Sequence, residues 1–200
     1  MEKPFVPSCE RNREPILKEL RRLMASSQRV LEISSGTGQH GVYFATDLPH
    51  LVWQPTDLAG ELAGIQLWVQ EAGLKNLLGP LELDVNQESH WQALGDQGFD
   101  TLFTANSLHI MGENDVDQLF FHLDILGDGF QKLIIYGPFK YDGEFTTKSN
   151  EEFDQWLKNR DPKSGVRDIE WVCEMAAEAG LVLSEDVSMP ANNQLLVFDK

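Results

Sequence analysis

The chain has 200 residues, of which 42% are hydrophobic, a size and composition typical of one globular domain. Its 32 acidic and 16 basic side chains give a formal net charge of −16, which disfavours binding to the phosphate backbone of DNA or RNA. No apolar run is long enough to span a membrane or to form the core of a signal peptide. Two distant cysteines, Cys9 and Cys173, offer neither a disulfide framework nor the spacing of metal ligands. We therefore expect one cytoplasmic domain with no metal, no membrane and no nucleic acid as a partner.

The first part of the chain alternates between two kinds of apolar pattern. Short apolar runs predict five strands, at residues 29–33, 51–55, 81–85, 99–105 and 132–136. Apolar residues at helical spacing predict five helices, at residues 12–26, 38–46, 58–72, 89–94 and 116–126. Pro15 suits the first turn of the leading helix. Repeated strand–helix units of this kind predict a parallel, doubly wound α/β sheet.

Residues 138–166 interrupt this alternation, because they are rich in aromatic and turn-forming residues. Within them, a capping box at residues 149–152 predicts one helix, and a further helix is expected from Asp168 to Gly180. Two more strands, at 181–187 and 194–198, are joined by a link so short that they must pair antiparallel. The predicted fold is a single domain with a three-layer, seven-stranded, mostly parallel sheet. It ends in an antiparallel hairpin and carries a lid-like insertion at 138–166.

The loop after the first strand carries the strongest functional pattern. Gly36, Gly38 and Gly41 match G-x-G-x-x-G, the dinucleotide-binding fingerprint, in which glycines let the backbone approach a ligand. Read from Glu32, the same loop is E-x-x-x-G-x-G, which resembles the first motif of class I S-adenosylmethionine (SAM)-dependent methyltransferases. Asp57 follows the next strand, at the distance where an acid accepts hydrogen bonds from ribose hydroxyls. Both NAD and SAM therefore fit this layout.

The predicted end of the sheet distinguishes between an NAD site and a SAM site. An antiparallel hairpin is the usual ending of the Rossmann-like sheet of methyltransferases, whereas an NAD-binding sheet normally continues with another crossover. The ending therefore favours SAM.

Several stretches of the chain resemble one family of methyltransferase-like proteins of unknown function, which includes the animal methyltransferase-like protein 26 and many bacterial members. These stretches are residues 9–17, 32–40, 53–57, 136–139, 149–154 and 189–193. They cover nearly the whole chain in order. The resemblance implies a class I methyltransferase fold with a SAM site and S-adenosylhomocysteine (SAH) as the product. One departure is Ser34, which stands where the commonest methyltransferase loop has a further glycine.

The resemblance and the strand ends together indicate the residues that bind the cofactor. By the resemblance, Glu32 acts near the methionine ammonium, and Asp84 and Val85 lie against the adenine. Asp57 is expected at the ribose, although an aspartate there also suits the N-cap of the next helix. The expected cofactor-binding residues are Glu32, Ser34, Gly36, Gly38, His40, Asp57, Leu58, Asp84, Val85 and Asn106.

Asn106 and His109 follow the fourth strand and are the candidate catalytic residues. Asn106 is expected where the sheet meets both cofactor and substrate. His109 is suited to remove a proton from an acceptor near neutral pH, and a purely structural role is an equal alternative.

Two further groups of residues are expected on the substrate side. Arg11, Asn12 and Arg13 precede the predicted first helix and could fold over the crevice. The two arginines could bind the carboxylate of the cofactor or an acidic substrate, and a solvated helix start is an equal alternative. Aromatic residues of the insertion could form a lid or simply pack together. The expected substrate-binding residues are Arg11, Asn12, Arg13, Tyr136 and Phe139, and the candidate lid residues are Phe139, Tyr141, Phe145 and Trp156.

These features predict a SAM-dependent methyltransferase that acts on a small-molecule acceptor. Two alternatives stay open. One is a non-catalytic binding protein with a methyltransferase fold, because no residue is decisive for catalysis. The other is an NAD-dependent oxidoreductase, because the glycine fingerprint is also literally that of a dinucleotide site.

Overall fold

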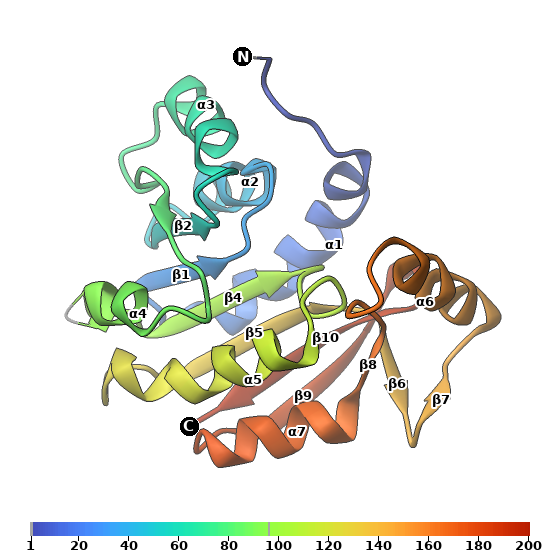
Figure 1. The fold of residues 1–200 in the computed structure, drawn as a ribbon. Coiled ribbons are helices and arrows are strands. Elements are labelled where there is room, and N and C mark those ends of the chain that lie inside the picture. The colour runs from blue at the N-terminus through green and yellow to red at the C-terminus, as the bar shows by residue number, and fades with distance from the viewer. Residues whose placement is uncertain (1, 96) are drawn as a thin grey trace.

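A seven-stranded sheet forms the centre of the structure, a computed structural model that describes residues 2–95 and 97–200 (Figure 1). Its strands are β1 (Arg29–Ile33), β2 (Val52–Asp57), β3 (Leu81–Glu82), β4 (Thr101–Ala105), β5 (Lys132–Gly137), β9 (Val182–Met189) and β10 (Asn193–Asp199). They lie in the order β3-β2-β1-β4-β5-β10-β9. The first five are parallel, and β10 is antiparallel to both of its neighbours. The predicted sheet is confirmed, and its last strand lies between β5 and β9.

Helices cover both faces of this sheet and complete the three predicted layers. One face carries α1 (Pro7–Leu23), α2 (Gln39–Asp47) and α3 (Leu62–Ala72). The other carries α4 (Glu88–Gly95), α5 (Glu113–Phe121), the 3₁₀ helix η1 (His122–Leu126) and α7 (Ile169–Glu178). Among the described residues, no helix is both long enough and apolar enough to cross a lipid bilayer.

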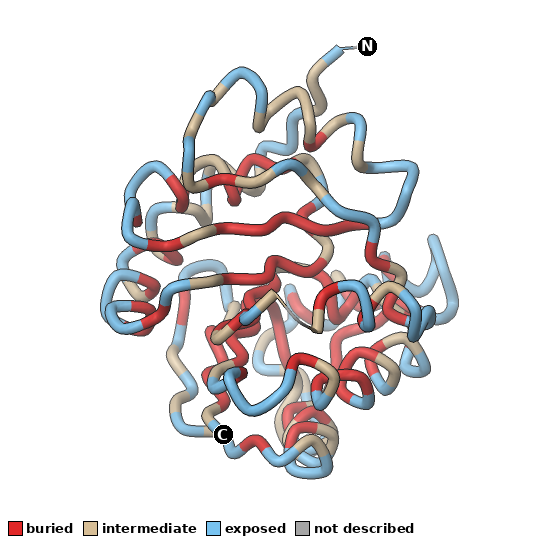
Figure 2. Tube along the Cα trace, turned by 90° about the vertical axis from the view of Figure 1, so that its left-hand side faces the viewer, coloured by how far each residue is buried: buried red, intermediate tan, exposed pale blue. Residues whose placement is uncertain are grey.

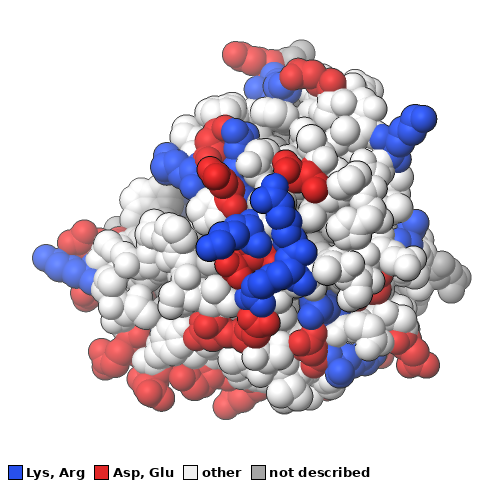
Figure 3. All heavy atoms as spheres, turned by 180° about the vertical axis from the view of Figure 1, so that it is seen from behind, with Lys and Arg blue, Asp and Glu red and all other residues white. Residues whose placement is uncertain are grey.

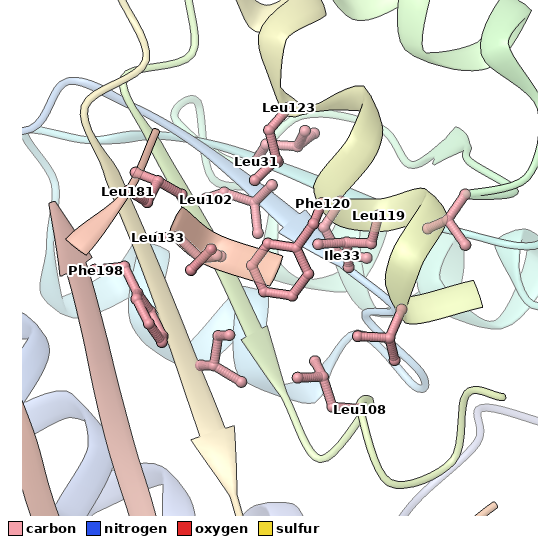
Figure 4. Close-up of a cluster of buried hydrophobic side chains, with 14 of the residues drawn as sticks. Leu31, Ile33, Leu102, Leu108, Leu119, Phe120, Leu123, Leu133, Leu181 and Phe198 are labelled. Carbon is pink, nitrogen blue, oxygen red and sulfur yellow. The ribbon is translucent and has the colours of Figure 1, made fainter. Parts of the chain in front are cut away.

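The central strands β1, β4, β5 and β10 are buried on both faces, because their alternate side chains enter different hydrophobic clusters. Leu31 packs toward α5, in a cluster that also contains Phe120 (Figure 4). Its neighbour Val30 packs toward α1, in a second cluster with Phe44 and Trp53. Buried residues accordingly lie along the central strands, and exposed residues lie mostly at the periphery (Figure 2).

The first helix begins earlier than the sequence predicts. It starts at Pro7 rather than residue 12, and Pro15 lies inside it instead of in its first turn. A tertiary contact fixes the start, since the Val6 backbone N–H donates to Oε1 of Gln39 at 2.6 Å. Pro15 removes one helical hydrogen bond without ending the helix. Residues 11–13 therefore belong to α1 and do not precede it.

The insertion is more regular than its sequence suggests. The strands β6 (Phe139–Tyr141), β7 (Glu144–Phe145) and β8 (Arg167–Asp168) form a small second sheet, and α6 (Lys148–Arg160) follows β7. The expected capping box at 149–152 is wrong, because the N-cap of α6 is Thr147, whose side chain accepts from the Asn150 backbone N–H. The helix predicted from Asp168 is confirmed as α7, capped by that residue.

Charged residues are intermixed on the face behind the sheet, where Lys and Arg lie among Asp and Glu (Figure 3). Ion pairs join α1 to α2 and to β9, and a further pair lies within α1. Arg22 pairs with Glu19 and Glu185, and Arg21 pairs with Asp47, all at 2.7–2.8 Å. Because these pairs are exposed, each adds little stability.

Candidate functional site

The loop between β1 and α2 leaves open space at its first glycine. Gly36 has φ +60°, and no atom lies within 4 Å of the position that a Cβ would take. Its backbone N–H donates to Oδ2 of Asp57 at 2.7 Å. The strand-end acid and the glycine loop are therefore joined directly, and the backbone at Gly36 is accessible to a ligand.

The other two glycines serve packing. A Cβ on Gly38 would lie 3.0 Å from Cγ2 of Ile65, so this glycine lets α2 and α3 approach each other. A Cβ on Gly41 would lie 2.9 Å from Oε2 of Glu32. The third glycine of the fingerprint is thus required by a buried acid beneath the loop.

Asp57 is held by two backbone donors. Besides Gly36, the N–H of Leu58 donates to its Oδ1 at 2.8 Å. Burial raises the pKa of Asp57 above its ordinary value, although both hydrogen bonds oppose this effect. The N-cap of α3 is Glu61, so Asp57 is not a helix cap. Each carboxylate oxygen keeps a lone pair that can accept from a ligand hydroxyl.

A cavity of about 520 Å³, called the first cavity below, lies at the carboxyl ends of β1, β2 and β4. This volume suits a small-molecule ligand. The expected cofactor residues that line it are Ser34, Gly36, Asp57, Leu58, Asp84, Val85 and Asn106. Further lining residues, which sequence reasoning missed, are Glu61, Leu83, Asn86, Ser107, Ile110, Met111 and Asp115.

A second cavity, of about 610 Å³, shares Asn106 with the first. Three expected substrate residues line it, namely Arg11, Asn12 and Tyr136. The other lining residues were not expected at the site, and they are Ser8, Pro138, Ser149, Asn150, Phe153, Pro190, Ala191, Asn192 and Asn193. Asn150 joins two of these segments, because its Nδ2 donates to the Asn192 carbonyl at 3.0 Å.

Backbone strain gathers at the two cavities. Within the described residues, five non-glycine residues have positive φ, at +51° to +59°. Four of the five line a cavity, namely Ser34, Asn106, Ala191 and Asn192. Such conformations cost about 1–3 kcal/mol each and cluster at functional sites. The strain therefore marks the same region independently of the glycine pattern.

Glu32 lies beneath the loop and lines neither cavity. It is 2% exposed, and its Oε2 accepts from Oγ of Ser35 and from Nε1 of Trp53, both at 2.9 Å. Burial raises its pKa to about 7, against the opposing effect of these two hydrogen bonds. Its position supports the loop from below, and it is not in contact with the cavity that the cofactor residues share.

His40 is likewise a supporting residue and not part of either cavity wall. Its Nε2 lies 2.7 Å from Oδ1 of Asn12, and its ring stacks on Phe44. Burial, reinforced by the charge of Arg13, lowers its pKa to about 4. Asn12 also lies close to Tyr136, whose pKa burial raises to about 12. The hydroxyl of Tyr136 is therefore protonated near neutral pH where it faces the second cavity.

His109, the candidate base, lines neither cavity. It is 5% exposed and packs edge-on against Phe153. Burial lowers its pKa to about 4, and the charge of Arg167 adds to this effect. The chain turns after Asn106 and buries the imidazole, which favours the structural role over that of a base.

Two expected substrate residues also lie elsewhere. Phe139 is 1% exposed and belongs to the core cluster around α5. Arg13 pairs with Glu10 at 2.6 Å and lies over the ring of Tyr43.

Of the candidate lid residues, Tyr141 donates to Asp186 at 2.7 Å. Trp156 is 50% exposed and stacks on Phe153, which itself lines the second cavity.

A family profile described as "Protein of unknown function (DUF938)" matches residues 3–200 of the chain. The chain belongs to this family. The family resemblance seen in the sequence is therefore confirmed.

Solved structures with the same fold as this DUF938 chain are methyltransferases. An O-methyltransferase family protein from Burkholderia thailandensis has a TM-score of 0.80 at 15% identity, covering 94% of this chain and 55% of its own. A putative O-methyltransferase from Nostoc punctiforme has a TM-score of 0.75 at 18% identity, with 92% and 56% coverage. An O-methyltransferase from neocarzinostatin biosynthesis, in complex with SAM and 2-hydroxy-5-methyl naphthoic acid, has a TM-score of 0.76 at 15% identity, with 96% and 54% coverage.

At these identities the likeness concerns the fold, which is that of class I methyltransferases. The chain spans about half the length of the solved structures it matches.

Proposed function

We propose that the protein binds SAM in the first cavity and methylates a small molecule held in the second. The observation that carries this proposal is the shared position of Asn106, which lines both cavities at the end of β4. Within the described residues, no hydrogen bond involves the side chain of Asn106. Its amide is therefore available to ligands in either cavity.

The residues of the first cavity fit the parts of SAM. Asp57 has free lone pairs for two ribose hydroxyls, and Gly36 leaves the backbone open beside it. Asp84 and Val85 line the same cavity and are available for the adenine. We infer that Glu32 acts on the cofactor indirectly, by fixing Ser35 and the loop through its hydrogen bonds.

The charge of the first cavity favours SAM over NAD. Four carboxylates line it, from Asp57, Glu61, Asp84 and Asp115, and its lining contains no Lys or Arg. SAM carries a sulfonium and an ammonium, whereas NAD would bring an anionic pyrophosphate into the same space. Four nearby acids attract the first ligand and repel the second.

Bound SAM would supply a methyl group attached to a positively charged sulfur. A nucleophilic atom of the acceptor would bond to the methyl carbon, and the sulfur would leave as part of SAH. The chain's own contribution is to align the acceptor and to exclude water. The amide of Asn106 and the neutral hydroxyl of Tyr136 are the polar groups placed to orient it. His109 lines neither cavity, so an acceptor that must be deprotonated would lose its proton to bulk solvent before it binds.

The small-molecule acceptor is supported by two observations. The second cavity has a volume of about 610 Å³, within the range of small-molecule sites. The similar enzyme from neocarzinostatin biosynthesis was solved in complex with SAM and a small aromatic acid, 2-hydroxy-5-methyl naphthoic acid. A macromolecular acceptor would need a broader and more open surface.

Calorimetry with SAM, SAH and NADH tests the proposal. We expect SAM and SAH to bind and NADH not to bind, and Asp57→Ala to weaken SAH about tenfold or more, through loss of hydrogen bonds to a charged group. Glu82→Ala removes an exposed acid from the neighbouring strand and is the matched control. Absence of SAM and SAH binding by the folded wild type would refute the proposal. Transfer of labelled methyl from SAM into a cell extract then separates an enzyme from a non-catalytic binding protein.

A further inference from the structure

The second cavity differs in charge from the first. Arg11 is its only charged lining residue, whereas four carboxylates line the first cavity. The two cavities meet at Asn106, so any ligand that reaches from one to the other experiences a change in electrostatic potential. A molecule in the second cavity is therefore oriented by its own charge.

Arg11 is not neutralised by a neighbouring acid. Arg13, Arg21 and Arg22 of the same helix each pair with a carboxylate, but none of the ion pairs among the described residues includes Arg11. Among the described residues, Arg11 therefore stands beside the second cavity without an ion-pair partner. Its planar guanidinium suits two-point binding of a carboxylate or phosphate.

The remaining wall of the second cavity suits a compact organic body. Tyr136 and Phe153 offer aromatic surface. The wall also contains the amides of Asn150, Asn192 and Asn193, whose amino groups already donate within the protein. Aromatic surface and a few polar groups are typical of sites for small organic ligands.

We propose that the methyl acceptor carries a carboxylate or phosphate group that Arg11 binds, with the accepting atom directed toward Asn106. This inference rests on the proposed methyltransferase function and specifies its substrate class. The acidic first cavity repels the anionic end of the acceptor and the guanidinium attracts it, so both effects favour the same orientation. Arg11 lines only the second cavity, which assigns it to the acceptor and not to the cofactor.

The test measures binding by ligand-observed NMR titration, with the protein saturated with SAH. The probes are benzoate and phenyl phosphate, with benzamide as the neutral match for benzoate. We expect at least one anion to bind more tightly than benzamide. Arg11→Gln should weaken that anion about tenfold, the effect of losing a hydrogen-bonded charge, and leave benzamide unchanged. Whichever anion loses affinity identifies the carboxylate or the phosphate as the favoured group.

Lys18→Gln is the matched control, because Lys18 is an exposed cation on the same helix that lies outside the second cavity. It should leave every affinity unchanged. Equal weakening of the anions in both variants would indicate a general charge effect and overturn the proposal. An absence of preference for anions over benzamide would overturn it as well.

A second measurement separates the acceptor from the cofactor. If Arg11→Gln weakened SAH but not 5′-methylthioadenosine, which lacks the amino acid part, Arg11 would belong to the cofactor site and the proposal would be wrong. If SAH did not bind the wild type at all, the methyltransferase proposal would fail. The anion titrations, repeated without SAH, would still decide whether Arg11 binds anions.

Discussion

The carboxylate of Glu32 lies 2.9 Å from the indole nitrogen of Trp53, with both side chains fully enclosed between β1, β2 and α2. Gly41 closes this enclosure from above, since a Cβ there would lie 2.9 Å from Oε2 of Glu32 and 3.2 Å from Nε1 of Trp53. The glycine fingerprint therefore reflects a buried acid as well as the open loop at Gly36.

We expect Gly41→Ala to destabilise the fold by about 1–2 kcal/mol, although alanine is the better helix former. The added methyl group must displace a carboxylate that two hydrogen bonds hold in place. Urea denaturation measures the effect. Gly129→Ala is the control, because nothing lies within 4 Å of its Cβ position and its φ is not positive. Equal stability of both variants would show that Glu32 moves freely.

Glu32 should make the protein less stable as the pH rises. Its pKa is about 7 when folded and 4.5 as a model value, so between these values the folded state holds a proton that the unfolded state has released. Stability therefore falls with increasing pH over this range, by about 3 kcal/mol. Glu32→Gln does not titrate, so this loss is absent from the variant. Between pH 4.5 and 7 its free energy of unfolding should therefore rise relative to that of the wild type. Urea denaturation at several pH values measures it, and parallel profiles would contradict the prediction.

His40 should have the opposite effect. Its pKa falls from 6.5 to about 4 on folding, so the unfolded state binds the proton first as the pH decreases. The contribution of His40 to the free energy of unfolding is fully present above pH 6.5. It is lost between pH 6.5 and 4, by about 3 kcal/mol. His40→Gln keeps a hydrogen-bonding group near Asn12 but does not titrate, so it should lose less stability on acidification. The imidazole titration of His40 in the folded wild type, followed by NMR, checks the cause, and a pKa near 6.5 would refute it.

The sheet was predictable because buried parallel strands are continuous apolar runs. Val30 and Leu31 illustrate this, since they face opposite clusters and both must be apolar. The third strand shows the limit of the same signal. It was predicted to reach Val85, but pairing ends at Glu82, while Leu83 and Val85 are buried outside the ladder. An apolar pattern indicates burial and does not distinguish sheet pairing from packing.

The first cavity was largely predictable, because its residues follow strand ends, and parallel strands bring those ends to one edge. The second cavity was not, because it joins α1, the start of α6 and the turn before β10. Contacts such as Asn150 to Asn192 span 42 positions in the chain, which no local spacing indicates. The stretches 149–154 and 189–193 nevertheless carried the family resemblance, and their common place at this cavity gives that resemblance a structural reason.

His109 lines neither cavity for a related reason. Its distance from the end of β4 suggested a position in the crevice, as for Asn106. A tight turn follows instead, in which the Ile110 N–H donates to the Ser107 carbonyl at 2.8 Å, and His109 is buried against Phe153. The direction of a side chain after a strand depends on this turn, and the sequence contains no glycine or proline there to reveal it.

Replacing Asn106 should affect SAH binding and methyl transfer much more than the free energy of unfolding. Its φ of +59° costs an ordinary residue about 1–2 kcal/mol, and asparagine somewhat less. Glycine removes that strain but adds freedom to the unfolded chain, so Asn106→Gly should change the unfolding free energy by no more than about 1 kcal/mol. Loss of the amide between the two cavities should nevertheless weaken SAH about tenfold and abolish methyl transfer. Thermal denaturation, calorimetry and labelled-methyl transfer measure the three effects.

Asp142→Gly provides the matched control, because Asp142 has a similar φ of +51° but lies in the turn between β6 and β7, outside both cavities. It should change stability to the same extent and leave SAH binding unaltered. If both glycine variants bound SAH like the wild type, the strained backbone at Asn106 would be a feature of the fold alone. If only Asn106→Gly unfolded, its side chain would be structural. Unchanged stability with lost binding is the result that places Asn106 between cofactor and acceptor.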